Sequence, residues 1–461
     1  MKLTKDINPR IFREYDLRGL DNIDLNEDVA YTIGKSYGTY IQKQGHYKAI
    51  IGHDNRLSSP LFSVALIKGI TETGVGAVDL GLVTTPMYYF AKIYYNIPTG
   101  IMITASHNPK EYNGFKISLN EIGRAYGSLI ESFRDFTLKG RFKTDKTAEM
   151  VNGNIKEAYL DNLKKSISLG DRKIKVVVDC GNGTGSIIIK DVLDMFDIDY
   201  ELLYCDSDPE FPNHVSDPAE SKNMLDLAKQ VKKVQADFGI GIDGDADRVG
   251  VVDENGKYIT PDLMMLIIYR SMAKTMKKKK ALFDVKCSRS LIEGLKELKL
   301  KPIMNRTGAV YCHKKASEDG IEFGGEYSGH LFFNDRYQGF DDGIYGALRL
   351  IEILSKTDKK FSELLEGINK YYSTEEIRIK VTDDNKFNIV DSVKEYCDKN
   401  KYKYLDIDGI RVEFDNSWAL IRASNTGPNL TVRFEASTIK ELDKIQKEFI
   451  DVINEQIKIH S

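Results

Sequence analysis

The chain has 461 residues, of which 41% are hydrophobic and 29% charged, and its formal net charge at pH 7 is −3. This balance argues against a nucleic-acid or membrane-surface footprint, and no apolar run reaches the about 18 residues that a membrane span needs. At about 100–200 residues per domain, the length predicts three or four domains. Residues 1–10 are polar and contain no apolar signal core, so we expect a cytoplasmic protein.

Short apolar runs recur along the first three quarters of the chain, each preceded by a basic residue and followed by a loop of Gly, Asp and Asn. The runs are 48–52, 175–178 and 280–283, and the helices predicted after them cover 60–73, 186–195 and 290–298. Runs of this length followed by helices are typical of parallel strands with crossover connections. Three copies predict three similar α/β domains with mixed or parallel sheets.

The last ninety or so residues have a different pattern. Strands are predicted over 375–381, 409–413, 418–422 and 429–434, followed by an amphipathic helix over 437–456. This order predicts an α+β domain with an antiparallel sheet and helices on one face. No long Pro/Ser linker is present, so we expect the domains to pack against one another with the site between them.

The cysteines do not form a recognisable disulfide or zinc pattern. Their number is odd and no two are spaced as CxxC; they are Cys180, Cys205, Cys287, Cys312 and Cys397. We therefore expect five reduced thiols.

The first motif with chemical potential is Thr104-Ala-Ser-His-Asn-Pro109, which follows an apolar run. Pro109 disfavours helix at Asn108, so a loop should present Ser106 at the carboxyl end of a strand, where open α/β sheets place ligand chemistry. A serine hydroxyl needs a base or a metal to become a nucleophile. Taken alone, the motif also fits a turn that Ser106 and Asn108 merely stabilise by hydrogen bonds.

The second motif, Asp243-Gly-Asp-Ala-Asp-Arg248, places three carboxylates on alternate residues after another apolar run. Three clustered carboxylates repel one another unless a cation lies between them, and hard oxygen ligands suit Mg²⁺ or Ca²⁺. An EF-hand would require glycine where Arg248 stands and a helix rather than a strand before the loop. We therefore predict a Mg²⁺ site here, with a solvated acidic turn as the alternative.

Two further loops suit a phosphorylated sugar. In Gly324-Gly-Glu-Tyr-Ser-Gly-His330, the paired glycines let the backbone approach a ligand closely, and Glu326, Ser328 and His330 can bind sugar hydroxyls. His330 can also move a proton. Arg422-Ala-Ser-Asn-Thr-Gly-Pro428 can hold an anion, because Arg422 grips phosphate bidentately and small donors satisfy the other oxygens. Each loop alone also fits an ordinary polar turn. Together, the four motifs predict phosphoryl transfer on a sugar phosphate.

These motifs resemble, in order and over essentially the whole chain, those of the α-D-phosphohexomutase superfamily, and most closely its bacterial phosphomannomutase/phosphoglucomutase branch. The matching stretches are 12–19 (FRxYDIRG), 104–109 (TASHNP), 112–117, 243–248 (DGDxDR), 325–330 (GExSGH), and 422–428 with 433–436 (RASNT and RFEA).

The resemblance implies α/β architecture with four domains around a central cleft: three similar α/β domains and a C-terminal α+β domain. The domains expected are 1–152 with the phosphoserine loop, 153–254 with the metal loop, 255–368 with the sugar loop and 369–461 with the phosphate loop. It also implies a phosphohexose mutase that interconverts hexose 1-phosphate and hexose 6-phosphate, of mannose, glucose or both, through a phosphoserine and a hexose 1,6-bisphosphate.

The resemblance further assigns roles to residues. One Mg²⁺ is expected on Ser106, Asp243, Asp245 and Asp247, and the expected catalytic residues are Ser106, Lys116, Arg248, His330 and Arg18. Substrate contacts are expected from Tyr15, Lys286, Glu326, Ser328, His330, Arg422, Ser424, Asn425, Thr426 and Arg433. If Lys116 acts as the base, it needs a lowered pKa, which burial can supply.

One position departs from the family pattern. Relatives often have Thr-Gly-His where this chain has Thr307-Gly308-Ala309, so alanine stands where a substrate-contacting histidine is expected, and the nearby His313 is not assumed to replace it. Substrate preference is therefore open, while the reaction class is not affected.

Three alternatives remain at this point. A phosphoglucosamine mutase usually carries GEQSGH, and Tyr327 argues against it. A catalytically inactive sugar-phosphate-binding protein would lack part of the phosphoryl-transfer site, whereas every predicted phosphoryl-transfer residue is present. A simple metal-dependent phosphatase would not need the separate phosphate-binding loop at 422–428, which argues against that alternative. The expected partners are small sugar phosphates, without nucleic acid or membrane, and we expect a monomer or weak dimer.

Overall fold

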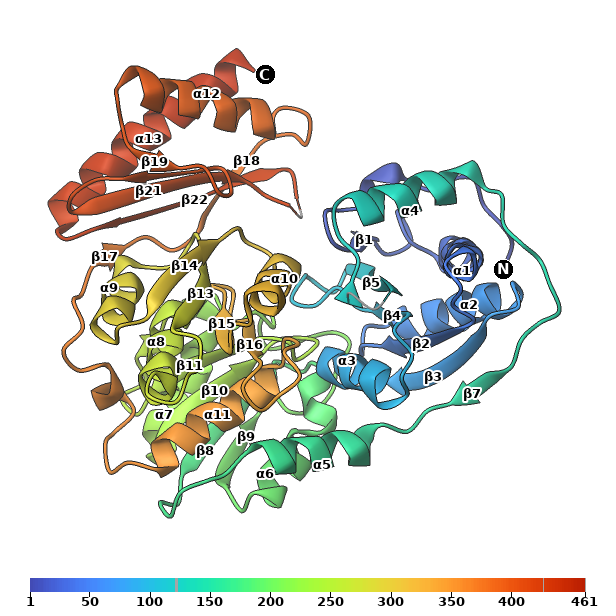
Figure 1. Cartoon of the computed structure of the whole chain (residues 1–461), viewed down its shortest axis with the longest axis horizontal. Helices are drawn as coiled ribbons and strands as arrows, with labels where there is room; N and C mark the ends of the chain where they lie inside the picture. The colour runs from blue at the N-terminus through green and yellow to red at the C-terminus, as the bar shows by residue number, and fades with distance from the viewer. Residues whose placement is uncertain (121–122, 426, 461) are drawn as a thin grey trace. The chain divides into compact units, whose positions relative to one another are not determined.

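The computed structural model describes residues 1–120, 123–425 and 427–460 (Figure 1). The chain forms two compact units: the first comprises Met1–Thr260 and Ser328–Leu364, and the second comprises Pro261–Tyr327 and Leu365–Ser461. The chain therefore enters the second unit after Thr260 and returns to the first at Ser328. Among the described residues, no helix is long and apolar enough to cross a bilayer.

The first unit begins with a mixed sheet whose seven strands lie in the order β1-β5-β4-β2-β3-β7, with β6 paired to β5. The strands are β1 (Leu17–Leu20), β2 (Lys48–His53), β3 (Gly76–Leu82), β4 (Gly100–Ile103), β5 (Tyr112–Asn120), β6 (Gly123–Arg124) and β7 (Met150–Asn152). Strands β2, β3, β4 and β7 pair in parallel, whereas β5 runs antiparallel to β4 and β1. The carboxyl end of β4 thus leads into the Ser106 loop, and β5 carries Lys116 back beside it.

Amphipathic helices supply the apolar core of this sheet. The helices are η1 (Pro9–Ile11), α1 (Glu27–Lys43), α2 (Ser59–Thr71), α3 (Thr85–Tyr94) and α4 (Ser128–Lys139). Helix α1 begins at Asn26, whose side chain accepts a hydrogen bond from the Val29 N–H, as an N-cap should. Helices α1 and α2 pack closely, because Gly34 and Gly69 leave room where a Cβ would meet backbone atoms at 2.3 Å.

The second sheet of the first unit has five strands in the order β12-β11-β10-β8-β9. These are β8 (Lys175–Asp179), β9 (Asp199–Leu203), β10 (Phe238–Ile242), β11 (Val249–Asp253) and β12 (Tyr258–Ile259), accompanied by α5 (Lys156–Ser166), η2 (Thr184–Ile187), α6 (Ile189–Met195), η3 (Ser221–Met224), α7 (Leu225–Val234), β16 (Leu331–Phe333) and α11 (Gly343–Ser355). Strands β9, β8 and β10 are parallel, and β10 and β11 form an antiparallel pair. The aspartate loop is the turn between β10 and β11.

The second unit starts with a smaller α/β region. It contains α8 (Pro261–Met272), β13 (Lys280–Asp284), α9 (Arg289–Glu297), β14 (Lys301–Asn305), α10 (Ala309–Asp319) and β15 (Phe323–Gly325), with β14 and β15 parallel to β13. Its third strand leads directly into Glu326, and the carboxyl end of β13 leads into Lys286. Beyond η4 (Ser362–Leu365), the chain continues into the C-terminal region.

The C-terminal region is a six-stranded sheet covered by two helices (Figure 1). Its elements are β17 (Tyr372–Ser373), β18 (Ile377–Lys380), α12 (Lys386–Lys399), β19 (Tyr404–Leu405), β20 (Ile410–Glu413), β21 (Ser417–Ala423), β22 (Asn429–Ala436) and α13 (Ile439–Ile459). The sheet pairings are antiparallel. Apolar residues of α12 and α13 share one core with the sheet, Phe449 being fully buried. The predicted antiparallel sheet with helices on one face is confirmed.

The recurring apolar runs also form the expected strands, β2, β8 and β13, followed by α2, α6 and α9. The predicted helix over 186–195 is wrong at its start, because residues 184–187 form the 3-10 turn η2 before α6 begins. In this turn the Thr184 N–H donates to the Gly244 carbonyl, at 2.9 Å, rather than within a helix.

Candidate active site in the first unit

The Ser106 loop holds its serine in an unusual backbone conformation. Ser106 has φ = 52°, in the left-handed region that L-residues other than glycine rarely adopt. Its N–H donates to Thr104 Oγ1 at 2.8 Å, and its side chain is only 3% exposed. Strain of about 1–3 kcal/mol at such a position persists only where the surroundings enforce it, and it clusters at functional sites.

Arg56 holds this loop in its conformation by hydrogen bonds to the backbone. Its buried guanidinium donates to the carbonyl oxygens of Ser106 (2.8 Å), Asn108 (2.7 Å), Pro109 (2.8 Å) and Tyr112 (3.0 Å). Asp54 holds the guanidinium from behind, at 3.1 Å from Nε. Sequence reasoning assigned no role to Arg56, because no local pattern reveals that an arginine will meet four backbone oxygens some fifty residues away.

The serine hydroxyl faces the aspartate loop. Ser106 Oγ donates to Asp243 Oδ2 at 2.9 Å. The two loops approach so closely that a Cβ on Gly244 would lie 2.5 Å from the Ser106 carbonyl oxygen, so only glycine fits there. The structure therefore brings together the first two motifs, which are 137 residues apart in sequence.

Three carboxylates converge in this loop, as their alternation predicts. Asp243, Asp245 and Asp247 are all 0% exposed, and one oxygen of each lies within 4.8 Å of those of the others. Ala246 adopts φ = 66°, which turns the chain tightly between the last two. Thr85 Oγ1 donates to Asp245 Oδ2 at 2.6 Å and so orients that carboxylate.

Lys116 supplies positive charge to the same cluster. Its Nζ lies 2.6 Å from Asp245 Oδ2 and 2.5 Å from Asp247 Oδ2. Burial acts to lower the pKa of Lys116, but the charges of Asp245 and Asp247 outweigh it and raise the pKa above its ordinary value. Burial thus does not supply the lowered pKa that Lys116 would need to act as the base, because burial also brings two carboxylates into contact with it.

The carboxylates themselves have unequal proton affinities. Burial raises the pKa of Asp243 well above its usual range, and the charges of Asp247 and Asp245 add to the effect. For Asp247, burial acts in the same direction, but Lys116 and His330 outweigh it and hold the pKa well below its usual range. One lysine therefore does not neutralise all three groups.

The donor set fits a hard divalent cation. Asp245 Oδ1 is buried and has no hydrogen-bond partner among the described residues. A buried carboxylate oxygen without a partner is costly unless a cation binds it, and oxygen ligands of this kind are those that Mg²⁺ and Ca²⁺ take. The cluster could thus hold a metal ion, together with the hydroxyl of Ser106.

Arg248 and His330 close another side of the cluster. Arg248 Nε lies 3.8 Å from Asp243 Oδ2 and donates to His330 Nε2 at 3.4 Å. His330 Nε2 is 3.2 Å from Asp247 Oδ1, while its Nδ1 is 2.9 Å from Ser328 Oγ. His330, which was predicted to move a proton, and Arg248 therefore both lie at the carboxylates.

Two further predicted residues, Arg18 and Tyr15, contact other side chains of the first unit. Arg18 NH1 donates to Asn108 Oδ1 at 2.8 Å, and Arg18 NH2 is paired with Asp16 at 2.6 Å. The ring of Tyr15 lies beneath the Arg124 guanidinium, 5.8 Å from the ring centroid. Arg124 was not predicted, and it approaches Asp341, whose Oδ2 also lies 3.6 Å from His330 Nε2.

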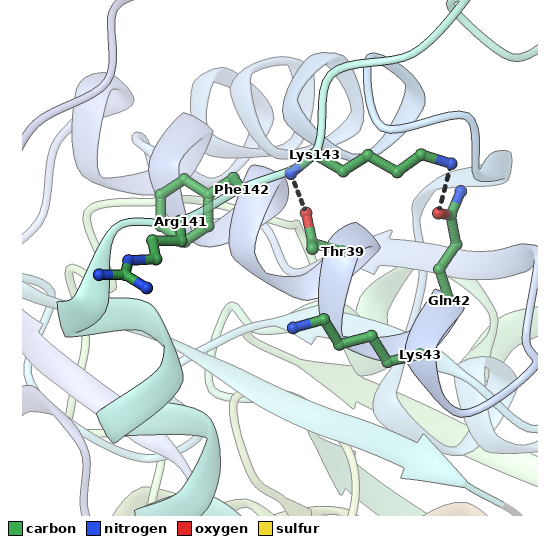
Figure 2. A pocket seen from close by; sticks show the side chains of 6 residues that line it. All are labelled: Thr39, Gln42, Lys43, Arg141, Phe142 and Lys143. Carbon is green, nitrogen blue, oxygen red and sulfur yellow. Dashed lines mark hydrogen bonds between the residues drawn. The ribbon is translucent and has the colours of Figure 1, made fainter.

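A separate pocket of about 470 Å³ in the first unit is lined by Thr39, Gln42, Lys43, Arg141, Phe142 and Lys143 (Figure 2). Its lysine and arginine side chains are exposed to solvent. Lys143 Nζ already lies 3.1 Å from Gln42 Oε1 and 2.7 Å from Asp145 Oδ2. No lining residue belongs to the predicted site.

Candidate binding residues in the second unit

The sugar motif is divided between the two units. Ser328 and His330 belong to the first unit, while Glu326 belongs to the second. In the second unit, Glu326 Oε1 accepts a hydrogen bond from the Gly308 N–H at 2.6 Å, next to Ala309 at the start of α10.

Cations of the second unit gather near Tyr327 and Glu376. Lys286 Nζ lies 2.7 Å from Glu376 Oε1, and the Arg433 guanidinium stacks 3.7 Å from the Tyr327 ring centroid. Burial acts to raise the pKa of Glu376, but Lys286, with Arg422 and Arg433, outweighs it and lowers the pKa. Three predicted substrate-binding cations therefore act on one carboxylate, and Glu376 was not predicted.

The C-terminal phosphate loop follows β21, as predicted. Arg422 Nε donates to Asp408 Oδ2 at 2.8 Å, and the Ser424 N–H donates to the Asn429 carbonyl at 2.9 Å. Asn425 is described, whereas the predicted contact Thr426 lies outside the described residues.

Comparison with known proteins identifies the family. The models of phosphoglucomutase/phosphomannomutase α/β/α domains I, II and III match residues 9–169, 157–256 and 260–371, and the C-terminal domain model matches 376–452. A phosphomannomutase/phosphoglucomutase of Pseudomonas syringae pv. tomato is 39% identical over 443 residues, or 95% of this chain and 94% of the relative. A phosphoglucomutase of Neisseria meningitidis serogroup A is 36% identical over 445 residues, or 96% of each chain.

A solved structure shows the same fold. The crystal structure of a phosphoglucomutase/phosphomannomutase family protein from Burkholderia thailandensis is 34% identical, has a TM-score of 0.89 and covers 98% of each chain. The chain belongs to the phosphoglucomutase/phosphomannomutase family. The family and the fold class expected from the motifs, three α/β domains and a distinct C-terminal domain, are thereby confirmed.

Proposed function

We propose that this protein interconverts hexose 1-phosphates and hexose 6-phosphates, of mannose, glucose or both, through a phosphoserine at Ser106 and a hexose 1,6-bisphosphate. The observation that carries the proposal is the contact of Ser106 Oγ with Asp243 Oδ2, at 2.9 Å, inside a buried cluster of three carboxylates and Lys116. Relatives at 36–39% identity over nearly the whole chain are named for these two mutase activities.

Four residues would hold one Mg²⁺ in this proposal: Ser106, Asp243, Asp245 and Asp247. Bound there, the ion supplies charge neutralisation for the phosphoryl group during transfer. The raised pKa of Asp243 and the unpartnered oxygen of Asp245 support this assignment, because both are relieved by a cation among the carboxylates.

The transfer step requires two proton movements. The attacking sugar hydroxyl loses its proton as its oxygen bonds to phosphorus, and the Ser106 oxygen gains one as its bond to phosphorus breaks. Phosphoryl transfer depends mainly on positioning and charge stabilisation, so the protein must place donors and acceptors at these two oxygens.

Several residues can meet these needs. Lys116 holds its proton at Nζ, since its pKa is raised, and can donate it to an oxygen that becomes negative. His330 lies between Ser328 and Asp247 and can exchange a proton through Nε2 or Nδ1. Arg248 and Arg18 stabilise charge and orient the serine loop, as permanent cations do.

The opposite end of the substrate needs an anion site. We assign the existing phosphate to Arg422, Ser424, Asn425 and Thr426, with Lys286 and Arg433 as further cations. Glu326, Ser328 and His330 receive sugar hydroxyls, and Tyr15 contributes from the N-terminal region. Because the product of the first transfer is a bisphosphate, it must turn end for end so that its other phosphate meets Ser106. We propose that the protein acts on these small molecules as a cytoplasmic monomer or weak dimer.

A coupled assay tests the proposal. Purified protein receives glucose 1-phosphate or mannose 1-phosphate, Mg²⁺ and a trace of the matching 1,6-bisphosphate, and the 6-phosphate is followed. We expect turnover on at least one sugar and none above background with Ser106→Ala, whose binding of the sugar phosphate should remain. The ratio of kcat/KM then names the preferred sugar.

Other outcomes point elsewhere. Turnover on glucosamine phosphate alone would make the protein a phosphoglucosamine mutase. Tight binding without turnover on any sugar would make it a binding protein, and release of inorganic phosphate faster than isomerisation would make it a phosphatase. Undiminished turnover in Ser106→Ala would reject the phosphoserine.

A further inference from the structure

Two cysteines of the first unit lie side by side at the ends of neighbouring strands. Cys180 directly follows β8, and Cys205 follows β9 by two residues. Cys205 Sγ lies 3.0 Å from Cys180 Sγ, and it also lies 3.3 Å and 3.4 Å from the carbonyl oxygens of Leu203 and Val178. Both side chains are thiols.

The backbone around this pair is fixed by the sheet. Strands β8 and β9 are parallel neighbours, with Asp179 opposite Leu203. The Cys180 N–H donates to the Leu203 carbonyl at 3.3 Å, and the Asn182 N–H donates to the Tyr204 carbonyl at 2.8 Å. Cys180 and Cys205 thus lie just beyond the paired strand ends, offset by one residue in register, and their sulfurs are 3.0 Å apart.

The two thiols differ in access to solvent. Cys180 is 0% exposed, whereas Cys205 is partly exposed. Its hydrogen bond with Cys205 and its burial raise the pKa of Cys180 well above its ordinary value. An oxidant from solvent therefore reaches Cys205 first, and Cys180 stands behind it as a protonated thiol.

We propose that Cys205 and Cys180 form a site of reversible oxidation, at which a peroxide converts the two thiols into one disulfide. In the first step the Cys205 thiolate attacks a peroxide oxygen, and the O–O bond breaks to leave a sulfenic acid on Cys205 and hydroxide. In the second step the Cys180 sulfur attacks the sulfenic sulfur. The S–O bond breaks, and water leaves with the proton of Cys180. Two sulfurs are oxidised by two electrons in all, and one peroxide is reduced.

The disulfide would tie the first unit together next to its proposed active site. The loop after Cys180 touches the aspartate loop: the Thr184 N–H donates to the Gly244 carbonyl at 2.9 Å, and a Cβ on Gly183 would lie 2.6 Å from that oxygen. Because the sulfurs already lie 3.0 Å apart, the bond can form without repacking these loops. Formation of the disulfide would thus protect Cys205 from irreversible oxidation and would leave the aspartate loop in place.

The test uses the full-length protein treated with a small molar excess of hydrogen peroxide. The denatured protein should lose two of its five thiols, and peptide mapping should find Cys180 linked to Cys205. Dithiothreitol should restore all five. Wild-type protein that keeps five thiols, or that forms a bridge between other cysteines, would overturn the proposal.

Two variants separate the roles. Cys205→Ala should keep its remaining thiols at the same peroxide dose, whereas Cys180→Ala should accumulate a sulfenic acid on Cys205 that dimedone traps. The matched control is Cys397→Ala, which removes a buried thiol of the second unit and should still lose two thiols. Equal thiol loss in Cys205→Ala and wild type would contradict the assignment. If a variant does not fold, the wild-type peptide map decides alone.

Discussion

Lys116→Met removes the lysine that contacts Asp245 and Asp247. In the structure its ammonium is 3% exposed and lies 2.6 Å and 2.5 Å from carboxylates that are 0% exposed. Removing one partner of a buried ion pair costs about 3–5 kcal/mol, because the other charge is left without compensation. The free energy of unfolding of a typical protein is about 5–15 kcal/mol, so this is a large loss of stability.

A bound cation should change this result. Divalent metal at Asp243, Asp245 and Asp247 replaces the positive charge that the substitution removes, so it should stabilise Lys116→Met more than wild type. We expect the melting temperature to fall on the order of 10 °C in EDTA, and by clearly less in excess Mg²⁺. Differential scanning calorimetry in both conditions measures the two differences.

Lys92→Met is the matched control. Burial, reinforced by the charge of Arg124, lowers the pKa of Lys92 to about 7, and its Nζ donates to Ser118 Oγ at 2.8 Å rather than to a carboxylate. This substitution leaves no buried anion behind, so we expect a loss below about 1.5 kcal/mol, the same with and without Mg²⁺. The reasoning fails if Lys116→Met is as stable as Lys92→Met in EDTA, or if Mg²⁺ raises both melting temperatures equally.

Other substitutions test the remaining parts of the site and fold. Asp245→Asn should lower Mg²⁺ affinity and kcat together; a Mg²⁺ titration of activity with an unchanged midpoint would contradict this. Arg56→Lys should lower kcat at least tenfold with little change in KM, because one ammonium cannot hold four carbonyl oxygens; a purely raised KM would contradict this. Arg422→Ala should raise KM and cost about 2–5 kcal/mol in kcat/KM if its phosphate contact is buried; an unchanged KM would argue against the phosphate loop. Burial raises the pKa of Asp342 to about 6, so its contribution to stability is present below its ordinary pKa of 3.8 and is lost as pH rises through about 6. Wild type should therefore lose about 2 kcal/mol relative to Asp342→Asn between pH 4 and pH 7, and parallel urea-unfolding profiles would contradict this.

The sequence predicted the parts of the site that depend on local pattern. Apolar runs of strand length predicted that Ser106 follows β4 and that the aspartates follow β10. The carboxyl ends of parallel strands meet at one edge of a sheet, where ligand chemistry is expected. Alternation over five residues was enough to predict convergence of Asp243, Asp245 and Asp247. The three boundaries between the four domains, at 152/153, 254/255 and 368/369, stay a prediction.

The contacts that set the charge of the site could not be predicted in this way. Lys116 meets Asp245 across 129 residues, and that contact reverses the direction of its pKa shift. Arg56 holds carbonyl oxygens, which carry no side-chain signature in the sequence. The chain passes from the second unit to the first between Tyr327 and Ser328, in the middle of the sugar motif. Hydrophobic periodicity predicts helices and strands but not the compact unit to which each belongs.

The most direct test of the central claim follows the phosphoryl group itself. Protein incubated with hexose 1,6-bisphosphate labelled on its phosphates should carry label on one peptide, that of Ser106, and should pass it to added hexose 1-phosphate or 6-phosphate at the rate of turnover. Ser106→Ala should acquire none. Label on another residue, or label on Ser106 that does not turn over, would contradict a phosphoserine mechanism.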